Sequence, residues 1–452
     1  MTNSLNTREL ALDTLIEVME NNGLSHVVIG QTLSKYQYLD KKDRSFYTRL
    51  SEGTIENIIL LDYIIDRFSN IQVKKMKPLI RNLLRTGVYQ IMFMNSVPDS
   101  AACNESVKIT IKRGFGALKG FVNGVLRNIA RNKENINYPD ASEQLIRHLS
   151  VYYSMPEWLV EKYIIELGTE ETSLLLKNYG HHENKICVRC NTSKADIDEI
   201  IDSLKKDEVK VTKSPQYKNA LYIEEYDYLE KLSAFKEGLI QVQDISSMLV
   251  ACVAAPKEDY FIMDLCAAPG GKTLHLADMT HGKATILSRD ISSKKIELID
   301  ENINRAGFSN IKTQVWDATV EDENYIEKAD VVVADVPCSG FGIIEKKPDI
   351  KYKASEEGCK NLVILQRNIL KNAVKYVKKG GKLIYSTCTI NKEENEENVK
   401  WIKENFEFDT FDISMYLPGN MKSQTMKDGY IQILPGMLNG DGFFIAGLIK
   451  KR

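Results

Sequence analysis

Hydrophobic positions recur at helical spacing along the first part of the chain. In residues 5–22 the apolar side chains that share one helix face are Leu5, Leu12, Leu15, Ile16 and Met19. Such a repeat of three and four residues indicates an amphipathic helix, and Gly23 is a typical stop signal. Similar patterns predict further helices over residues 27–36, 41–68, 77–95, 100–112 and 117–132. Because no stretch here alternates like a strand, residues 1–135 are predicted to form an all-α domain.

The pattern changes after a polar linker near residues 132–140. A helix is expected to begin at Met155-Pro156, since proline is favoured in a first helical turn. Short elements then follow closely: a strand at 185–191, a helix at 194–205 and strands near 208–212 and 219–223. One helix among three strands in so few residues indicates a small α+β subdomain, which we place at residues 150–235.

From residue 236 onward, short apolar runs each end in a polar or reactive side chain. The side chains that end five of these runs are Asp264, Asp290, Asp317, Asp335 and Cys388. A last apolar run over residues 442–448 closes the pattern. These runs predict an open α/β sheet of the Rossmann type over residues 236–452. Ligands of such sheets bind at the carboxyl ends of the strands, so the five side chains are candidate site residues.

A glycine turn follows the first of these runs. The stretch Cys266-Ala-Ala-Pro-Gly-Gly-Lys272 leads into a predicted helix, as in the strand–turn–helix unit of nucleotide-binding sheets. Position 266 is not the glycine that a Walker A loop requires, and the dinucleotide pattern G-x-G-x-x-G is absent. Asp290 lies 20 residues after Gly270, where such sheets place the acid that binds ribose hydroxyls. These observations favour S-adenosyl-L-methionine as the ligand.

Three stretches resemble the signature motifs of the RNA cytosine-5 methyltransferases. They are Asp264-Leu-Cys-Ala-Ala-Pro-Gly-Gly-Lys-Thr273, Asp335-Val-Pro-Cys-Ser-Gly340 and Tyr385-Ser-Thr-Cys-Thr389. The resemblance implies that the methionine part of the cofactor is cradled by Cys266, Ala267, Ala268, Pro269, Gly270, Gly271 and Lys272. It also implies that Asp290 binds the ribose and Asp317 the adenine, although an aspartate at a strand end also commonly caps the next helix. Asp335 is expected to bond the cytosine or the amino group of the cofactor.

Methylation of carbon 5 of cytosine calls for a cysteine thiolate. The thiolate adds to carbon 6, the activated ring attacks the methyl group, and a base then removes the proton from carbon 5. Cys338 and Cys388 both stand at strand ends, and the residues alone do not choose between them. The resemblance assigns Cys388 as the nucleophile and Cys338 as the residue that assists release. Lys272 is the cation of these motifs that is available to favour a thiolate, and no metal is expected.

The helical region resembles the NusB-type RNA-binding fold. The stretches that carry this resemblance are Lys77-Pro-Leu-Ile-Arg-Asn-Leu-Leu-Arg-Thr-Gly-Val-Tyr-Gln-Ile91 and Lys119-Gly-Phe-Val-Asn-Gly-Val-Leu-Arg-Asn-Ile129. Residues 1–133 contain 19 Lys and Arg against 12 Asp and Glu, a charge of +7, so the remainder of the chain carries −9. A basic head suggests contact with phosphate, and a solvated helix surface explains the charge equally well. The basic clusters are Lys74, Lys75, Lys77, Arg81 and Arg85, and Lys112, Arg113, Lys119, Arg127 and Arg131.

The helical region and the three motifs together are similar to the B-type family of bacterial enzymes that methylate carbon 5 of a cytidine in 16S rRNA. This similarity implies the small ribosomal subunit or its rRNA precursor as partner. Two alternatives remain: an RNA cytosine-5 methyltransferase that acts on tRNA, and a non-catalytic RNA-binding assembly factor. An amino-nitrogen methyltransferase is disfavoured, because Asp335-Val-Pro-Cys338 lacks an aromatic residue after the proline.

Composition changes this picture little. The chain of 452 residues is 43% hydrophobic and 27% charged, as in an ordinary globular protein. No apolar run approaches the ~18 residues of a membrane span, and the first residues do not resemble a signal peptide. The eight cysteines are scattered rather than framed as a disulfide scaffold, which is typical of a cytoplasmic protein. A monomer is expected.

Three further stretches are given no role in the chemistry. Cys187 and Cys190 lie near His181 and His182, but residues three apart in a predicted strand point to opposite faces, so a zinc site is not expected. Residues 391–398 are interpreted as a solvated acidic helix. Residues 417–441 are rich in proline and glycine and are interpreted as a long loop beside the site, a candidate substrate lid.

Overall fold

The computed structural model describes residues 6–180, 185–419, 421 and 423–452; His181 and His182 lie outside the described residues. The chain divides into two compact units. The first comprises Met1–His182 together with Ile344–Lys353, and the second comprises Glu183–Ile343 and Ala354–Arg452. This division does not follow the expected boundaries at residues 135, 150 and 236, which stay predictions.

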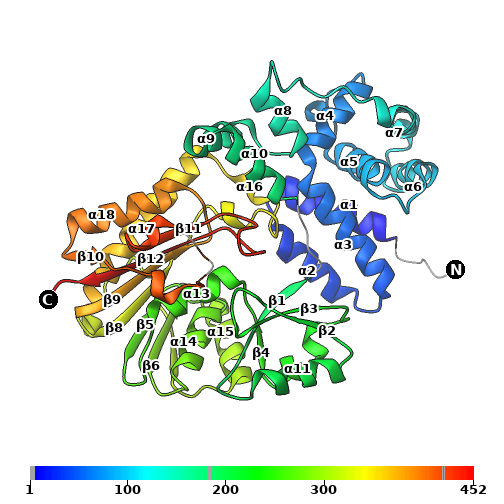
Figure 1. Ribbon diagram of the computed structural model, residues 1–452. Coiled ribbons are helices and arrows are strands. Elements are labelled where there is room, and N and C mark those ends of the chain that lie inside the picture. The colour runs from blue at the N-terminus through cyan, green and yellow to red at the C-terminus, as the bar shows by residue number, and fades with distance from the viewer. Residues whose placement is uncertain (1–5, 181–184, 420, 422) are drawn as a thin grey trace. The chain divides into compact units, whose positions relative to one another are not determined.

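The first unit is helical, as predicted (Figure 1). Its longer helices are α1 (Thr7–Glu20), α2 (Ser25–Lys35), α3 (Lys41–Glu56), α4 (Ile58–Phe68), α5 (Pro78–Phe93), α6 (Asp99–Lys112), α7 (Lys119–Asn132), α8 (Leu145–Tyr152), α9 (Glu157–Leu167) and α10 (Thr169–Asn178). The single helix expected over residues 41–68 is wrong, because Asn57 separates α3 from α4. The Asn57 side chain donates to the Gly53 carbonyl at 2.8 Å and closes the end of α3. Leu50, Leu61, Leu84 and Leu126 belong to the core of this unit.

A short segment from late in the chain completes the helical unit. Residues 344–353 end in the one-turn helix α16 (Ile350–Lys353). The Tyr352 hydroxyl donates to the Glu56 carbonyl at 2.7 Å and accepts from the Ile58 amide at 3.2 Å. Ser25 donates to the Asp349 carboxylate. The segment therefore bonds the ends of α2, α3 and α4, and it begins only six residues after Cys338.

The second unit begins with a small antiparallel sheet in the order β2-β3-β1-β4. Its elements are β1 (Ile186–Cys190), α11 (Ile197–Lys206), β2 (Lys210–Lys213), β3 (Ala220–Glu224), α12 (Ser233–Lys236) and β4 (Ile240–Val242). The three predicted strands and the helix are confirmed, and β4 adds an edge strand that the sequence analysis did not expect. Cys190 is buried with Ile200 and Leu221, whereas Cys187 packs against the core of the neighbouring domain. The two thiols thus lie on opposite faces, and the described residues contain no cluster of three metal-binding side chains.

A mixed sheet with strand order β10-β12-β9-β8-β5-β6-β7 forms the rest of this unit, with β11 paired to β12. The five strands from β9 to β7 are parallel. The strands are β5 (Phe261–Asp264), β6 (Thr285–Asp290), β7 (Ile311–Val315), β8 (Ala329–Asp335), β9 (Val377–Thr387), β10 (Phe408–Thr410), β11 (Tyr430–Ile433) and β12 (Phe443–Lys450). The α/β class is confirmed. Residues 417–441 are not a loop throughout, because β11 lies within them.

Helices cover both faces of the parallel strands (Figure 1). They are α13 (Ile245–Ala254), α14 (Gly271–Met279), α15 (Ser293–Ala306), α17 (Glu356–Tyr376) and α18 (Glu396–Asn405). Ile262 and Val331 pack in the layer of α13 and α14, whereas their neighbours Met263 and Val332 pack in the layer of α17 and α18. Strands buried on both faces explain why the sequence shows continuous apolar runs here. No helix among the described residues is long and apolar enough to cross a bilayer.

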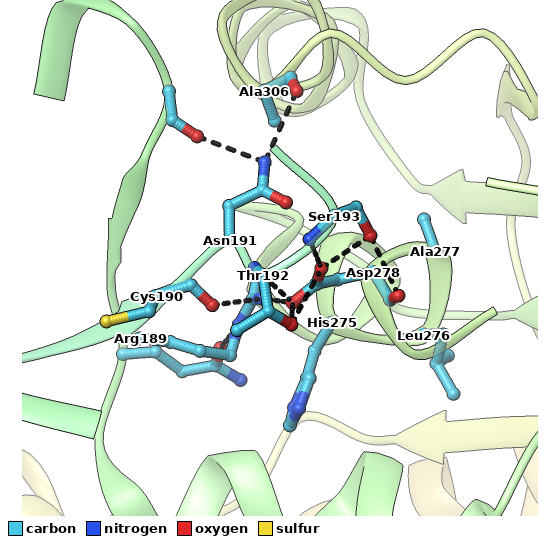
Figure 2. A network of polar contacts seen from close by, with 12 residues as sticks. Arg189, Cys190, Asn191, Thr192, Ser193, His275, Leu276, Ala277, Asp278 and Ala306 are labelled. Carbon is cyan, nitrogen blue, oxygen red and sulfur yellow. Dashed lines mark hydrogen bonds and ion pairs between the residues drawn. The ribbon is translucent and has the colours of Figure 1, made fainter. Parts of the chain in front are cut away.

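A buried ion pair joins the small sheet to the large one (Figure 2). Arg189 on β1 donates to the Asp278 carboxylate on α14 at 2.9 Å, and both side chains are almost fully buried. Figure 2 shows that Thr192 and Ser193 also point to this carboxylate, and Ser193 donates from its amide at 2.8 Å. A buried charge is tolerated only with such complete pairing. The small sheet is therefore held to the helix that follows the glycine turn.

Candidate active site

The parallel strands bring the predicted polar side chains to one edge of the sheet. Asp264 at the end of β5 is in register with Ser288 on β6 and with Val333 on β8. Asp335 at the end of β8 is in register with Ser386 on β9, two residues before Cys388. The expectation that these strand ends share an edge is therefore confirmed.

The glycine turn is short and consists mainly of residues with small side chains. Gly270 has a φ of +100°, in the region that favours glycine, and it caps the N-terminus of α14. The Ala268 amide donates to the Asp290 carboxylate at 3.0 Å, which fixes the turn against the end of β6. A β-carbon at Gly271 would lie 3.6 Å from the Gln243 side chain, an ordinary van der Waals distance. The turn thus leaves its backbone approachable at the N-terminus of a helix.

Asp264 lies under this turn and is fully buried. The Thr273 hydroxyl donates to its carboxylate at 2.7 Å, and the Ser288 hydroxyl lies 3.1 Å from that of Thr273. Burial raises the pKa of Asp264 to about 7, because the charged form loses its hydration. This carboxyl group is therefore a structural element whose protonation depends on pH near neutrality.

The raised pKa predicts a pH dependence of stability. The folded state holds the Asp264 proton more tightly than the unfolded state, in which the pKa is about 3.9. The free energy of unfolding should therefore fall as pH rises from about 4 to about 7, and Asp264→Asn should remove this decline. Urea unfolding of both proteins at about pH 5 and about pH 8 measures it. A difference between the two proteins that stays constant with pH would contradict the prediction.

The two predicted cysteines meet. The sulfur atoms of Cys338 and Cys388 lie 3.2 Å apart, within hydrogen-bonding distance. Their loops are fastened together, since the Ser339 and Thr389 hydroxyls are 2.7 Å apart and the Gly342 amide donates to the Cys388 carbonyl at 3.0 Å. The pKa of Cys338 is raised well above its usual value. The hydrogen bond with Cys388 is the largest cause, and burial is the second. Cys338 thus holds its proton beside Cys388.

Lys272 and Asp335 form an ion pair at the same edge. The Lys272 ammonium lies 2.7 Å from the Asp335 carboxylate, whose other oxygen accepts from the Ser386 hydroxyl at 2.8 Å. The ammonium also lies 5.2 Å from the centre of the Phe443 ring. Burial lowers the pKa of Lys272, but Asp335 outweighs it, with smaller contributions from Asp264 and Cys388, so the pKa is raised. Lys272 is therefore charged at neutral pH.

The interpretation of residues 391–398 as a solvated helix is wrong. Asn391, Glu394, Asn395 and Asn398 are all fully buried. The Glu394 carboxylate accepts from the Ser339 amide at 2.9 Å, from the Gln366 amide group at 2.8 Å and from the Asn391 amide group at 2.9 Å. Asn395 donates to the Thr389 carbonyl at 3.0 Å. These polar groups hold both cysteine loops, and their acidic, amide-rich sequence concealed that role.

Glu394→Ala is expected to destabilise the protein by about 2–4 kcal/mol, because it leaves three buried donors without their acceptor. It should also lower methyl transfer, since the Cys338 loop loses its bond to the Ser339 amide. Urea unfolding and an activity assay measure the two effects. Glu397→Ala, at an exposed glutamate of the same stretch, is the matched control. Equal stability of the two variants would contradict the prediction.

The predicted nucleoside-binding acids stand side by side at the ends of β6 and β7. The Asp290 carboxylate accepts from the Ile291 amide at 2.8 Å and lies 3.0 Å from the Lys295 ammonium. Asp317 is exposed, and its carboxylate accepts from the Thr319 amide at 2.9 Å within a turn, whereas the N-cap of the next helical turn is Asp322. Ile291 is 61% exposed directly after Asp290, which is unusual for an isoleucine. Ile291 was not among the residues predicted from the sequence.

Several cations of the helical unit form ion pairs that were not predicted from the sequence. Arg81 pairs with Glu20, Arg85 with Asp62, Lys112 with Glu9, and Arg113 with Glu9 and Asp13. Lys74, Lys75 and Lys119 are exposed and form no ion pair with the residues that the structure describes. Only part of the two basic clusters therefore remains open to a partner.

Parallel strands with a glycine turn after the first of them make the large sheet a Rossmann-type α/β domain, an arrangement that suits a methyltransferase. The comparisons agree. Residues 251–449 match the model of the 16S rRNA methyltransferase RsmB/F family, residues 5–131 match the NusB family, and residues 155–228 match the ferredoxin-like domain of RsmF/B-like methyltransferases.

Two curated relatives match along their whole length. The chain is 36% identical to the "Probable ribosomal RNA small subunit methyltransferase B" of Bacillus subtilis, with 98% of each chain covered. It is 30% identical to the protein of the same name from a Synechocystis species, with 99% of this chain and 100% of that one covered. The chain therefore belongs to the family of ribosomal RNA small subunit methyltransferases B.

Solved structures support the fold. The crystal structure of PH0851 is similar with a TM-score of 0.83 and 27% identity, and 99% of each chain is covered. NSun6 from Pyrococcus horikoshii, solved with SFG, has a TM-score of 0.58 and 24% identity over 66% of this chain and 98% of its own, which shows the fold alone.

Proposed function

We propose that this protein transfers a methyl group from S-adenosyl-L-methionine to carbon 5 of a cytidine in 16S rRNA, through a covalent bond between Cys388 and the base. The observation that carries the proposal is the pair of thiols at 3.2 Å beside the glycine turn. A single buried cysteine is commonly inert. Two thiols in contact at the ligand edge of a methyltransferase sheet suit a reaction that needs both a nucleophile and a base.

The residues at this edge suit the cofactor. The small turn from Ala267 to Gly271 offers approachable backbone, Asp290 offers a carboxylate for ribose hydroxyls, and the exposed Ile291 offers an apolar surface for a flat ring. The role of Asp317 in binding the base is supported by its neighbour Trp316, whose amide donates to the Asp290 carbonyl at 2.9 Å and so brings the ends of β6 and β7 together. S-adenosyl-L-methionine, when bound, supplies its methyl group as an electrophile. Lys272 and Asp335 are the charged pair nearest to the thiols.

Cys388 is the nucleophile in this proposal. As a thiolate it forms a bond to carbon 6 of cytosine, and the electrons of the ring double bond move toward the ring nitrogen, so carbon 5 becomes nucleophilic. The charged Lys272 favours the thiolate by its positive charge. In this proposal the Asp335 carboxylate, held by Lys272 and Ser386, accepts a hydrogen bond from the exocyclic amino group of cytosine or from the amino group of the cofactor. The family resemblance assigns Cys388 as the nucleophile, and the contact between the two sulfur atoms supports a reaction in which both thiols take part.

Cys338 acts in the second half of the reaction. After carbon 5 carries both the methyl group and its original hydrogen, a base removes that hydrogen as a proton. The electron pair of the broken bond restores the ring double bond and expels Cys388 as a thiolate. While Cys388 is bonded to the base it no longer carries charge, so a principal cause of the raised Cys338 pKa is absent. Once Cys338 has released its own proton to solvent, its thiolate accepts the proton from carbon 5.

The substrate assignment rests on the helical unit and the family. Lys74, Lys75 and Lys119 are exposed cations that suit phosphate. The target base must leave its stack to reach a thiol, which costs a few kcal/mol in a duplex and less in a loop, so single-stranded RNA is the favoured substrate. The related proteins are named as small-subunit rRNA methyltransferases, which favours 16S rRNA over tRNA.

Product analysis tests the proposal. The purified protein is incubated with S-adenosyl-L-methionine and a transcript of small-subunit rRNA, with tRNA transcripts in parallel, and the digested RNA is examined for 5-methylcytidine. We expect 5-methylcytidine in the rRNA alone. Methylation of tRNA instead would favour the tRNA enzyme, and RNA binding without methylation of naked or partly assembled subunits would favour the assembly factor.

A further inference from the structure

Arg289 is a fully buried arginine that the proposed chemistry does not use. It stands on β6 immediately before Asp290, so its side chain leaves the strand on the opposite face from that of Asp290. A charged group without exposure is costly unless it is completely paired. The contacts of the Arg289 side chain therefore indicate its role in the structure.

The hydrogen bonds and ring contacts of the Arg289 guanidinium come from one neighbouring segment, and its Nη1 has no hydrogen-bond partner among the described residues. It donates twice to the Gln314 side-chain oxygen, at 3.0 and 2.8 Å, and donates to the Asp322 carboxylate. Its carbon lies 4.8 Å from the centre of the Trp316 ring and 4.7 Å from that of Tyr325. Residues 314–325 thus surround a single guanidinium group with an amide, an acid and two aromatic rings.

This segment carries Asp317. Two hydrogen bonds hold the segment in its conformation. The Trp316 ring nitrogen donates to the Val320 carbonyl at 2.9 Å, and the Asn372 side chain donates to the Ala318 carbonyl at 2.9 Å. The segment has little regular structure, since η5 (Glu323–Tyr325) is a single turn. Arg289 is the group that ties its beginning, at Gln314, to its end, at Asp322 and Tyr325.

Resting on the proposed function, we propose that Arg289 is a positioning residue for the nucleoside half of the cofactor. Asp290 is its neighbour in the chain, and Asp317 belongs to the segment that it holds. Their relative position sets the distance between the ribose-binding and base-binding groups. Displacement of such groups by about 1 Å weakens binding strongly, so one buried guanidinium controls cofactor affinity without touching the cofactor.

The test compares cofactor binding with RNA binding. Arg289→Met is expected to raise the Kd for S-adenosylhomocysteine, measured by calorimetry, by about tenfold to a hundredfold. The KM for S-adenosyl-L-methionine should rise similarly, while kcat at saturating cofactor and the affinity for rRNA stay within about threefold of the wild-type protein. Arg289→Lys should fall between, because an ammonium does not reproduce the planar double hydrogen bond.

Two further variants make the result decisive. Arg305→Met is the matched control, since Arg305 also stacks on a ring, Phe235 at 3.9 Å, but bonds the Ile240 carbonyl of the small sheet. If Arg289→Met does not fold, Trp316→Leu carries the test with the same expected rise in Kd. Unchanged affinity in the folded Arg289 or Trp316 variant, or an equal loss in Arg305→Met, overturns the inference alone. Absence of S-adenosylhomocysteine binding by the wild-type protein overturns the proposed function and this inference with it.

Discussion

Cys388→Ala is expected to lower 5-methylcytidine formation by at least about 10³-fold, because no other group at the site forms the bond to carbon 6. Cys338→Ala is expected to stop turnover at a later step. With the nucleophile intact and the base missing, the Cys388–cytosine bond forms and persists. Gel electrophoresis under denaturing conditions should therefore show a protein–RNA adduct with Cys338→Ala and none with Cys388→Ala.

The two sulfur atoms are in contact, and each variant leaves the other thiol in place between the same two hydrogen-bonded loops. Adduct formation by the two variants can therefore be compared directly. Cys252→Ala, at a half-buried free cysteine on α13, is the control for loss of a thiol elsewhere in the domain. It should retain activity and form no stable adduct. An adduct with Cys388→Ala and none with Cys338→Ala would reverse the two roles.

Periodicity predicted the long elements of this fold well. The helices of the head and the strands that end at Asp264, Asp290 and Asp335 follow from patterns that extend over several residues. The missed strands β4, β10 and β11 have three or four residues each, too few for a pattern to develop. The break between α3 and α4 was missed for the opposite reason, since apolar positions continue across Asn57.

Tertiary context decided what the sequence analysis misjudged at the site. Glu394 stands in a run of charged and amide residues that is typical of a surface, and only the converging donors of Ser339, Gln366 and Asn391 explain its burial. The stretch Ser288-Arg289-Asp290 is unexpectedly polar in the sequence, but the partners of Arg289 lie 25 or more residues away, so no local pattern shows what its charge contacts. The segment at 344–353 joins the helical unit through Tyr352 contacts almost 300 residues distant in sequence. The rule that ligands bind at the carboxyl ends of parallel strands locates the site, but it does not identify the buried residues that hold the site in its conformation.

Lys272→Met is expected to lower kcat by about 10²–10³-fold while rRNA binding is retained. Three features of the structure carry this expectation. The ammonium is buried and charged, it lies 2.7 Å from Asp335, and Cys388 is among the groups that raise its pKa. Without it the Cys388 thiolate loses its neighbouring cation, and Asp335 is left as an uncompensated negative charge beside the thiols.

Alkylation of Cys388 by iodoacetamide separates these two effects. In a Cys338→Ala background, the reaction with Cys388 should require a higher pH in Lys272→Met than with Lys272 present, because only the thiolate is alkylated. Adding Asp335→Asn to Lys272→Met removes the unpaired carboxylate and should return part of this reactivity. Lys283→Met, which breaks an exposed ion pair with Glu258, is the control and should leave the pH profile unchanged. If Lys272→Met alkylates with the same pH profile as its parent, the cation does not favour the thiolate, and its contribution is confined to holding Asp335 in place.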